Sequence, residues 1–366
     1  IFSIYYSFIR GFMAMKKDNI YLANGYINIP LLLSYPENFI FLIGARGIGK
    51  TYGILQHCLN KKLKFCYIRR TDTQLQVCKS DKGNPFKKLN SDLNLNIRCD
   101  SDHDITGFFN FVYDEDKQKY VKYGDLIGYA FALSTFANLR SIDLSDVDII
   151  IYDEFIKQVD ERPIKNEATA FLNMCETIMR NRELQGLPAL KVICAANSNS
   201  LDNDLLYYLQ LVTVAEKMQR TGKELYINKD RCLRLYIPVK SPISEAKTNT
   251  SLYKLTAGTD FAKMALENKF IDDDTSLIAS RPLVEYIPHV TIGEICIYKH
   301  KSRYEYYVST HKSGTPNTFS VSDRGCTMFK RQYPYLWDAF YLDGKIFFET
   351  YGCQAAFQRY LKGKKY

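Results

Sequence analysis

Residues 41–53, FLIGARGIGKTYG, constrain this chain more than any other stretch. Within them, GARGIGKT at 44–51 matches the pattern GxxxxGK[ST] between an apolar run, NFIFLI, and a stretch with helical spacing from Lys50 to Leu59. Glycines let backbone N–H groups approach phosphate oxygens, and the N-terminus of the following helix favours an anion. The pattern therefore predicts a nucleoside triphosphate site made by the phosphate loop, Gly44, Ala45, Arg46, Gly47, Ile48, Gly49, Lys50 and Thr51.

The chemistry expected of this loop requires a metal ion and a base. We expect Lys50 to reach the β- and γ-phosphates and the Thr51 hydroxyl to hold Mg²⁺. A second apolar run, DIIIY at 148–152, ends in Asp153 and Glu154. Asp153 is the predicted second Mg²⁺ ligand, and Glu154 can orient and deprotonate the attacking water, which favours ATP hydrolysis over a GTPase switch. The alternative is an acidic strand end that faces solvent.

Apolar strands alternate with helices over the first half of the chain. Buried strands are predicted at 38–43, 65–69, 148–152 and 190–196, an amphipathic helix at 167–182, and an inserted hairpin at 107–133. This alternation indicates an α/β fold with a parallel sheet covered on both faces. Because a strand and about a hundred residues separate the phosphate loop from the acidic pair, we expect a P-loop ATPase of the additional-strand (ASCE) class.

Four further polar residues are candidates for the site. Asn197, just past the strand at 190–196, is placed to sense the γ-phosphate, or is only a polar residue in the turn NSNS. Arg46 can touch the γ-phosphate in cis or brace the loop. Arg180, at the end of the helix at 167–182, and Arg140 are candidate arginine fingers for a neighbouring subunit. A structural alternative for Arg180 is a cation that offsets the helix dipole.

Three domains are expected after a short leader. Residues 1–14 are apolar, contain no signal-peptide cleavage site and precede Met15, so we treat them as a non-native or disordered leader. The P-loop domain is expected at 15–240, and a polar linker or lid with one helical patch at 241–274. A domain at 275–366 is expected to hold strands around 290–309 and helices near 327–341 and 353–362.

Composition limits the class of partner. The net charge of +9 among 366 residues leans toward polyanions such as nucleic acid. No apolar run reaches the roughly 20 residues that cross a bilayer, so no membrane partner is expected. The ten cysteines are scattered without a CxxC pair, which is typical of reduced, buried thiols rather than of zinc sites or disulfides.

Five segments in order, FLIGARGIGKTYG, FCYIRR, IIIYDEFI, FLNMCETIMRNRE and VICAANS, resemble the DNA packaging ATPases of small tailed phages with protein-primed genomes. The resemblance runs from about Met15 to near the C-terminus. It implies an ATP-driven translocase, a homopentameric ring on the portal of a viral procapsid in the host cytoplasm, which pumps double-stranded DNA inward, with an RNA or protein adaptor as a further possible partner. It also implies that Glu154 is the catalytic glutamate and Arg180 the trans-acting arginine; a lysine of the family falls near Arg140.

The same resemblance implies an RNase H-like C-terminal domain without an active nuclease. Residues 275–366 hold only seven acidic residues, and we expect one of them, Glu294, in a central strand, which is few for a two-metal site. The 13 basic residues of this segment give it an excess of six positive charges. Lys299, Lys301 and Arg303, interleaved with tyrosines in a turn, are candidate contacts to the DNA backbone or a solvated hairpin tip.

Three other functions remain open from the sequence. A ring-shaped helicase or recombinase-type ATPase would share the P-loop sheet but unwind strands. A nucleotide-dependent binding module would turn over ATP without regard to DNA. A nuclease-competent terminase would cut DNA with Mg²⁺ or Mn²⁺, which the small number of carboxylates argues against.

Overall fold

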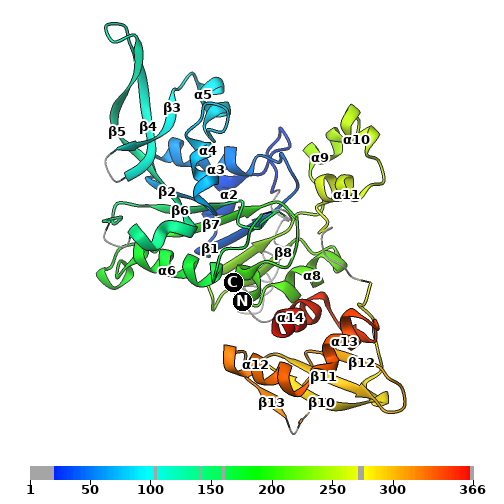
Figure 1. Ribbon diagram of the computed structural model, residues 1–366. Helices are drawn as coiled ribbons and strands as arrows, with labels where there is room; N and C mark the ends of the chain where they lie inside the picture. The colour runs from blue at the N-terminus through cyan, green and yellow to red at the C-terminus, as the bar shows by residue number, and fades with distance from the viewer. Residues whose placement is uncertain are drawn as a thin grey trace, which may run out of the picture.

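The computed structural model describes residues 20–102, 105–139, 142–158, 161–270, 276–312, 314–315 and 317–362. The expected leader at 1–14 lies outside these residues, as does Arg140. Figure 1 shows two sheets with a group of short helices beside the first.

A nine-stranded sheet forms the first part of the molecule. Its strands, from edge to edge, are β3 (Ile97–Asp102), β4 (Ile105–Asp114), β5 (Lys119–Ala132), β2 (Phe65–Arg69), β6 (Ile149–Asp153), β7 (Lys191–Ala196), β1 (Phe39–Ile43), β9 (Leu233–Tyr236) and β8 (Leu225–Asn228). The six strands from β5 to β9 run parallel, whereas β3, β4 and β8 pair antiparallel at the edges. Because β7 lies between β1 and β6, the additional strand stands where the ASCE class requires it.

Helices cover both faces of this sheet, as its continuous apolar strands require. One face packs against α2 (Ile29–Ser34), α3 (Lys50–Lys61), α4 (Asp72–Cys78) and α5 (Lys87–Leu93). The other packs against α6 (Glu167–Met179), α7 (Asp204–Tyr208) and α8 (Val212–Thr221), with η1 (Leu133–Leu139) near its rim and η2 (Glu183–Gln185) after α6. The core is therefore two apolar layers, and the carboxyl ends of β1 and β6 lie at one rim between them.

The hairpin predicted at 107–133 within the α/β domain is present as β4 and β5, and β5 extends the sheet by pairing with β2, Phe65 opposite Gly128. One predicted boundary differs from the structure. The helix predicted at 167–182 ends at Met179. Arg180 caps it with a φ of 45° and a ψ of −138°, a conformation outside the helical region, and the helix stops there.

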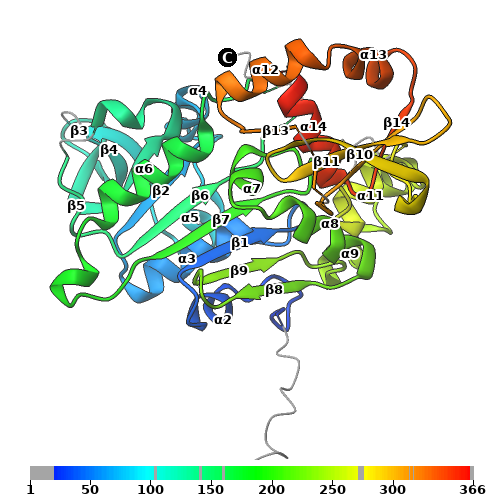
Figure 2. The same ribbon diagram turned by 90° about the horizontal axis from the view of Figure 1, so that it is seen from below.

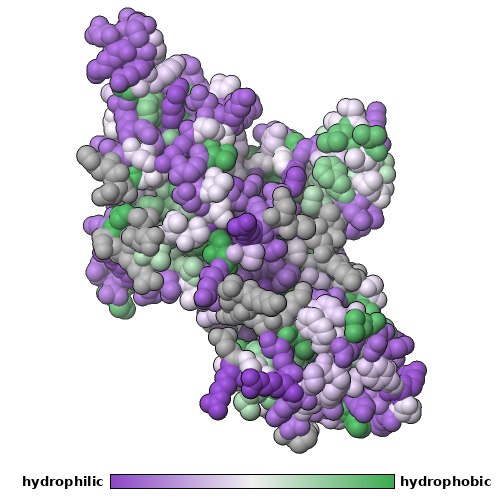
Figure 3. Space-filling model, in the orientation of Figure 1, coloured by the Kyte–Doolittle hydropathy of each residue, from purple (hydrophilic) through white to green (hydrophobic). Residues whose placement is uncertain are grey.

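Three short helices, the linker helices, connect the two sheets. They are α9 (Pro242–Lys247), α10 (Ser251–Leu255) and α11 (Asp260–Glu267), of which the sequence predicted only the last. Asn268, 2% exposed, fastens the end of α11 to the first sheet: its Nδ2 donates to the carbonyls of Ile43 at 2.9 Å and Pro238 at 2.7 Å. Figure 3 shows apolar surface around α10, where Leu255 is 82% exposed.

A mixed five-stranded sheet forms the last part, in agreement with the α/β architecture expected there. Its order is β13 (Thr318–Phe319), β10 (Tyr286–Ile292), β11 (Ile295–His300), β12 (Tyr306–Ser309) and β14 (Ile346–Phe348), after η3 (Leu283–Glu285). The middle three strands are antiparallel, and both edge strands pair in parallel. Helices α12 (Asp323–Gln332), α13 (Tyr335–Tyr341) and α14 (Tyr351–Lys362) pack against it.

Two expectations for this part were wrong. The single helix predicted near 327–341 is two helices, because Pro334 cannot continue α12 and instead caps α13. Glu294 is not in a strand. It lies in the two-residue turn between β10 and β11, where Gly293 supplies the positive φ of 55° that a tight hairpin needs.

The C-terminal helix α14 joins the two sheets (Figure 2). The Tyr351 N–H donates to Glu216 on α8 at 3.0 Å, and Arg359 Nη1 donates to Asp204 at 2.9 Å. The Tyr207 and Tyr360 hydroxyls also contact each other. These contacts tie the end of the chain to the P-loop sheet. We propose domain boundaries near 240 and 275, on either side of the segment that contains the linker helices.

The environment of the cysteine side chains agrees with the expectation that most of these thiols are buried. Eight of the ten cysteines, all of them within the described residues, are buried, and none forms a disulfide; Cys232 is exposed and Cys326 half-buried. Among the described residues, none of the helices combines the length and apolarity that crossing a bilayer requires.

Candidate nucleotide site

The phosphate loop lies between β1 and α3, as predicted. Gly47 and Gly49 have φ angles of 75° and 84°, which residues with a Cβ rarely adopt. Gly49 is also the N-cap of α3, and no side chain caps the first turn of this helix. The N-terminus of α3 therefore presents backbone N–H groups that can donate hydrogen bonds to a bound anion.

Lys50 turns back over this loop. Its Nζ donates to the carbonyls of Gly44 at 2.8 Å and Ala45 at 2.9 Å, and to Asn197 Oδ1 at 2.9 Å. Burial lowers the pKa of Lys50 to about 7, although Asp153 and Glu154 offset part of this shift. A bound polyphosphate would supply the negative charge that favours the protonated form.

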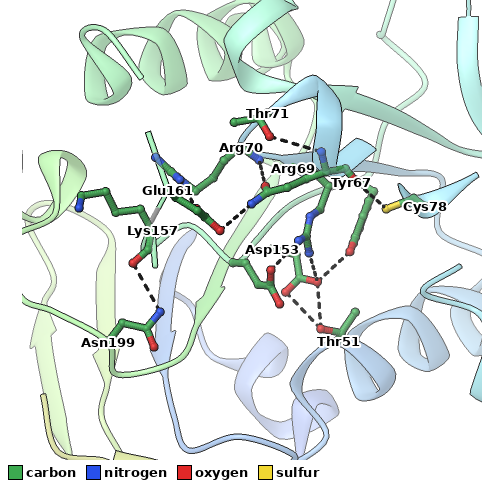
Figure 4. Close-up of polar contacts among 12 residues, drawn as sticks. Thr51, Tyr67, Arg69, Arg70, Thr71, Cys78, Asp153, Lys157, Glu161 and Asn199 are labelled. Carbon is green, nitrogen blue, oxygen red and sulfur yellow. Dashed lines mark hydrogen bonds and ion pairs between the residues drawn. The ribbon is translucent and has the colours of Figure 1, made fainter. Parts of the chain in front are cut away.

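Thr51 and Asp153 lie together, as a shared Mg²⁺ requires. Thr51 Oγ1 is 3.1 Å and 3.0 Å from the two carboxylate oxygens of Asp153, which is 4% exposed. The Tyr67 hydroxyl donates to Asp153 Oδ2 at 2.8 Å and orients the carboxylate (Figure 4). A carboxylate and a hydroxyl beside a phosphate loop are hard oxygen donors, which suit Mg²⁺.

Glu154 stands beside a residue that the sequence analysis did not single out. Arg69 Nη2 lies 2.5 Å from Glu154 Oε2, and Arg69 Nη1 lies 3.5 Å from Asp153 Oδ2. The sheet explains this contact: β2 and β6 are parallel neighbours with Ile68 opposite Tyr152, so Arg69 leaves β2 beside Asp153. The sequence feature that could have indicated this contact is the pair of arginines at the end of FCYIRR.

The second arginine of that pair points into the opposite layer. Arg70 is fully buried and meets Glu167 in a bidentate contact, Nε to Oε1 at 2.8 Å and Nη2 to Oε2 at 2.9 Å. The Tyr152 hydroxyl donates to the same Glu167 at 2.6 Å, and Arg70 also contacts Glu161. This network fixes the start of α6 against β2 and β6.

The phosphate loop, Asp153, Glu154 and Asn197 surround one pocket of about 270 Å³. Its lining is Arg46, Gly47, Gly49, Lys50, Thr51, Tyr52, Asp153, Glu154, Ala196 and Asn197. The structure thus brings together the predicted phosphate, metal and water-activating residues. Arg46 joins them, and its buried Nε has no hydrogen-bond partner among the described residues, which fits a guanidinium that can bind an anion.

The remaining predicted residues lie outside this pocket. Arg180 does not line it: the Arg180 side chain is half exposed and donates to the Ile142 carbonyl at 3.2 Å. Lys299 is the penultimate residue of β11, and Lys301 and Arg303 follow in the turn before β12. Lys301 Nζ donates to the Val284 carbonyl at 2.7 Å, and Arg303 pairs with Glu285 at 3.5 Å.

The glycine loop before α3, the acidic end of β6 and the strand β7 between them define a P-loop nucleoside triphosphatase of the ASCE class. Residues 23–323 match the family model of the podovirus DNA encapsidation protein (Gp16). The chain therefore belongs to this family, which confirms the resemblance found in the sequence, and packaging of DNA is the function that defines the family.

Individual relatives agree. The chain is 30% identical over 255 residues to the DNA packaging protein of Bacillus phage B103, covering 68% of this chain and 70% of that protein. It is 29% identical over 261 residues to the DNA packaging protein of Bacillus phage phi29, covering 70% and 69%.

Solved structures show the same fold over nearly the whole chain. The bacteriophage Phi-29 viral genome packaging motor assembly contains a chain with a TM-score of 0.63 at 22% identity, covering 92% of this chain and 98% of that one. The Phi-28 gp11 DNA packaging motor gives 0.62 at 17% identity, covering 93% and 99%. The fold thus extends through the linker helices and the second sheet.

Proposed function

We propose that this chain is the ATP-hydrolysing subunit of a viral DNA packaging motor, which drives double-stranded DNA into a procapsid. The observation that supports this most is the convergence of Lys50, Thr51, Asp153 and Glu154 on one pocket in a member of the DNA encapsidation family. A protein that only binds nucleotide needs the phosphate loop, but it does not need a carboxylate such as Glu154 beside Thr51 and Asp153.

Each side chain has a chemical role in this proposal. Lys50 and the loop N–H groups bind the phosphates of ATP, and Thr51 and Asp153 would hold Mg²⁺. When bound, Mg²⁺ neutralises charge on the phosphate oxygens. Glu154 orients and deprotonates the attacking water, and Arg69 sets the position of the Glu154 carboxylate. Asn197, through its contact with Lys50, reports on the terminal phosphate.

We further propose that catalysis is completed between subunits of a ring. Arg180, half exposed and outside the pocket of its own chain, is suited to donation in trans; Arg140 is the second candidate, and Arg46 acts in cis. By family resemblance the ring is a homopentamer on the portal vertex of a procapsid in the host cytoplasm, with an RNA or protein adaptor as a possible partner. Arginine fingers supplied in this way raise turnover by about 10³-fold or more.

The second sheet is proposed to contact DNA rather than to cut it. Its segment has 13 basic and seven acidic residues. Several of these carboxylates already have partners: Glu349 accepts from Ser309 at 2.7 Å, and Tyr304 donates to Asp343 at 3.0 Å. Lys299, Lys301 and Arg303 are proposed to meet the phosphate backbone, because a motor must move along DNA without reading its sequence.

A subunit-mixing experiment tests this proposal. DNA-stimulated ATP hydrolysis is measured for wild-type protein, for Glu154→Gln, for Arg180→Ala and for mixtures of the two variants. Each variant alone is expected to lose turnover, and a mixture is expected to regain part of it where an intact arginine meets an intact glutamate. A ring helicase would also respond to DNA but would unwind it without a procapsid. Normal turnover by assembled Arg180→Ala would contradict the trans assignment.

A further inference from the structure

The linker helices place a second ammonium group against the phosphate loop. Lys247, the last residue of α9, donates from Nζ to the Arg46 carbonyl at 2.5 Å, across a sequence separation of 201 residues. It also lies over Gly47, since a Cβ built on Gly47 would overlap the Lys247 ammonium. Lys50 of the loop itself therefore contacts the carbonyls of Gly44 and Ala45, and Lys247 of the linker contacts that of Arg46.

This ammonium has no carboxylate to neutralise it among the described residues. Its contact is a neutral carbonyl, and burial alone lowers the pKa of Lys247. The positive charge of Lys247 also acts on Lys50, since it contributes to the lowered pKa of Lys50. A bound anion stabilises a partly desolvated cation beside a phosphate-binding loop. Without an anion, the desolvation of that cation costs free energy.

Two features order the segment that carries Lys247: a cap at the start of α9 and a contact of Asn268, which caps the end of α11, with the first sheet. At the start of α9, Ser241 caps the helix by accepting from the Ser244 N–H at 3.0 Å, and both serines are buried. After α11, Asn268 binds the carbonyl of Ile43, the residue just before the phosphate loop. Lys247 therefore belongs to a segment that is ordered at both ends, and its own contact with the Arg46 carbonyl places its ammonium at the phosphate loop.

We propose that Lys247 is a further phosphate-binding residue, supplied in cis by the linker, which favours a nucleoside triphosphate over a diphosphate. The proposal rests on the nucleotide site described above. A triphosphate has more negative charge than a diphosphate, so a cation added at the loop attracts it more strongly. In exchanging the Arg46 carbonyl for a phosphate oxygen, Lys247 gains a charge-assisted hydrogen bond.

The connection between the two sheets thereby responds to the nucleotide. The only covalent path from β9 to β10 is the segment that contains α9, α10 and α11. When the terminal phosphate is present, Lys247 holds this segment to the nucleotide by a charge-assisted hydrogen bond. When that phosphate is lost, Lys247 returns to the neutral Arg46 carbonyl, so hydrolysis in one sheet changes the restraint on the segment that leads to the other.

Calorimetric titration of ATPγS and of ADP into the full chain tests this role. Lys247→Gln is expected to weaken ATPγS binding about tenfold and ADP binding about threefold or less, because the lost contact is charge-assisted. Lys247→Arg keeps the charge and is expected to restore most of the ATPγS affinity. Lys254→Gln, an exposed lysine of α10, is the matched control and should bind both nucleotides as wild type does.

The outcomes separate this proposal from the nucleotide site itself. Equal weakening of ATPγS and ADP by Lys247→Gln would mean that Lys247 only braces the loop, and unchanged affinities would mean that it has no part in binding; either result overturns the proposal. If wild-type protein binds neither nucleotide, or if Lys50→Ala binds as wild type does, the nucleotide site is wrong instead.

Discussion

Arg69 and Glu154 form a 2.5 Å contact between Nη2 and Oε2 at the rim where β2 and β6 end. The Glu154 backbone has a φ of 55°, so the carboxylate leaves the strand in an unusual direction and depends on a partner to define its position. Arg69 is that partner, and it also lies 3.5 Å from Asp153, so one guanidinium, with its side chain 13% exposed, faces both carboxylates of the site.

Arg69→Ala should slow ATP hydrolysis more than it weakens ATP binding. The loss of a group that positions Glu154 is expected to lower kcat about tenfold to a hundredfold, because small displacements of a catalytic group are costly. Arg69→Lys should retain part of kcat, since an ammonium can still reach one carboxylate. Steady-state ATPase assays give the answer, and an unchanged kcat for Arg69→Ala would remove Arg69 from the mechanism.

Thr51→Val should raise the Mg²⁺ requirement. Valine preserves the shape of threonine but removes the hydroxyl that lies 3.0 Å from Asp153. We expect the Mg²⁺ concentration for half-maximal ATPase to rise about tenfold, within the range typical of groups around a metal site. Thr51→Ser keeps the hydroxyl and should behave as wild type. If the Mg²⁺ dependence of Thr51→Val matches that of Thr51→Ser, the hydroxyl has no metal role.

Arg70→Met should destabilise the fold. It leaves Glu167 buried without its bidentate cation, a change that costs about 3–5 kcal/mol of unfolding free energy. Thermal denaturation should show this as a Tm lower by roughly 10 °C. Arg324→Met removes an exposed arginine and should shift unfolding free energy by less than about 0.5 kcal/mol. Similar Tm values for the two variants would refute the structural role of Arg70.

His289→Gln should make stability less dependent on pH. Burial, with a contribution from Lys299, holds the pKa of His289 below its ordinary value of 6.5, and its Nε2 contacts the Tyr335 hydroxyl at 2.5 Å. The unfolded chain therefore binds this proton more readily, and stability is lost as pH falls through 6.5.

The measurement is the fall in Tm between pH 7.5 and pH 5.5. We expect a smaller fall for His289→Gln than for wild type, whereas His311→Gln, at an exposed position, should resemble wild type. An equal fall in all three proteins would show that His289 does not contribute.

Local pattern was enough to predict the central strands of the P-loop sheet and the residues that meet at its pocket, but not the strands β3, β8 and β9. The runs at 38–43, 65–69, 148–152 and 190–196 are apolar on both faces, and each became a buried strand within a residue or two. Because these strands are parallel, residues at their carboxyl ends meet at one rim, and this places Asp153 and Asn197 near Lys50.

Contacts between distant segments could not be predicted in this way. Arg69 looked like the polar end of a strand, and only the pairing of β2 with β6 shows that it faces Glu154. Lys247 lies 201 residues from the carbonyl that it contacts, in a helix of six residues that leaves little periodicity to detect. The turn at Glu294 was missed because only two residues, Gly293 and Glu294, interrupt a mostly apolar run.

Packaging of DNA into procapsids by Glu154→Gln is the most direct test of a motor driven by this site. Purified procapsids, DNA and ATP are mixed with wild-type or variant protein, and the DNA protected from nuclease is measured alongside phosphate release. We predict that Glu154→Gln still binds ATPγS but neither releases phosphate nor protects DNA. Protection of DNA by Glu154→Gln at the wild-type rate would contradict the coupling of packaging to hydrolysis at this pocket.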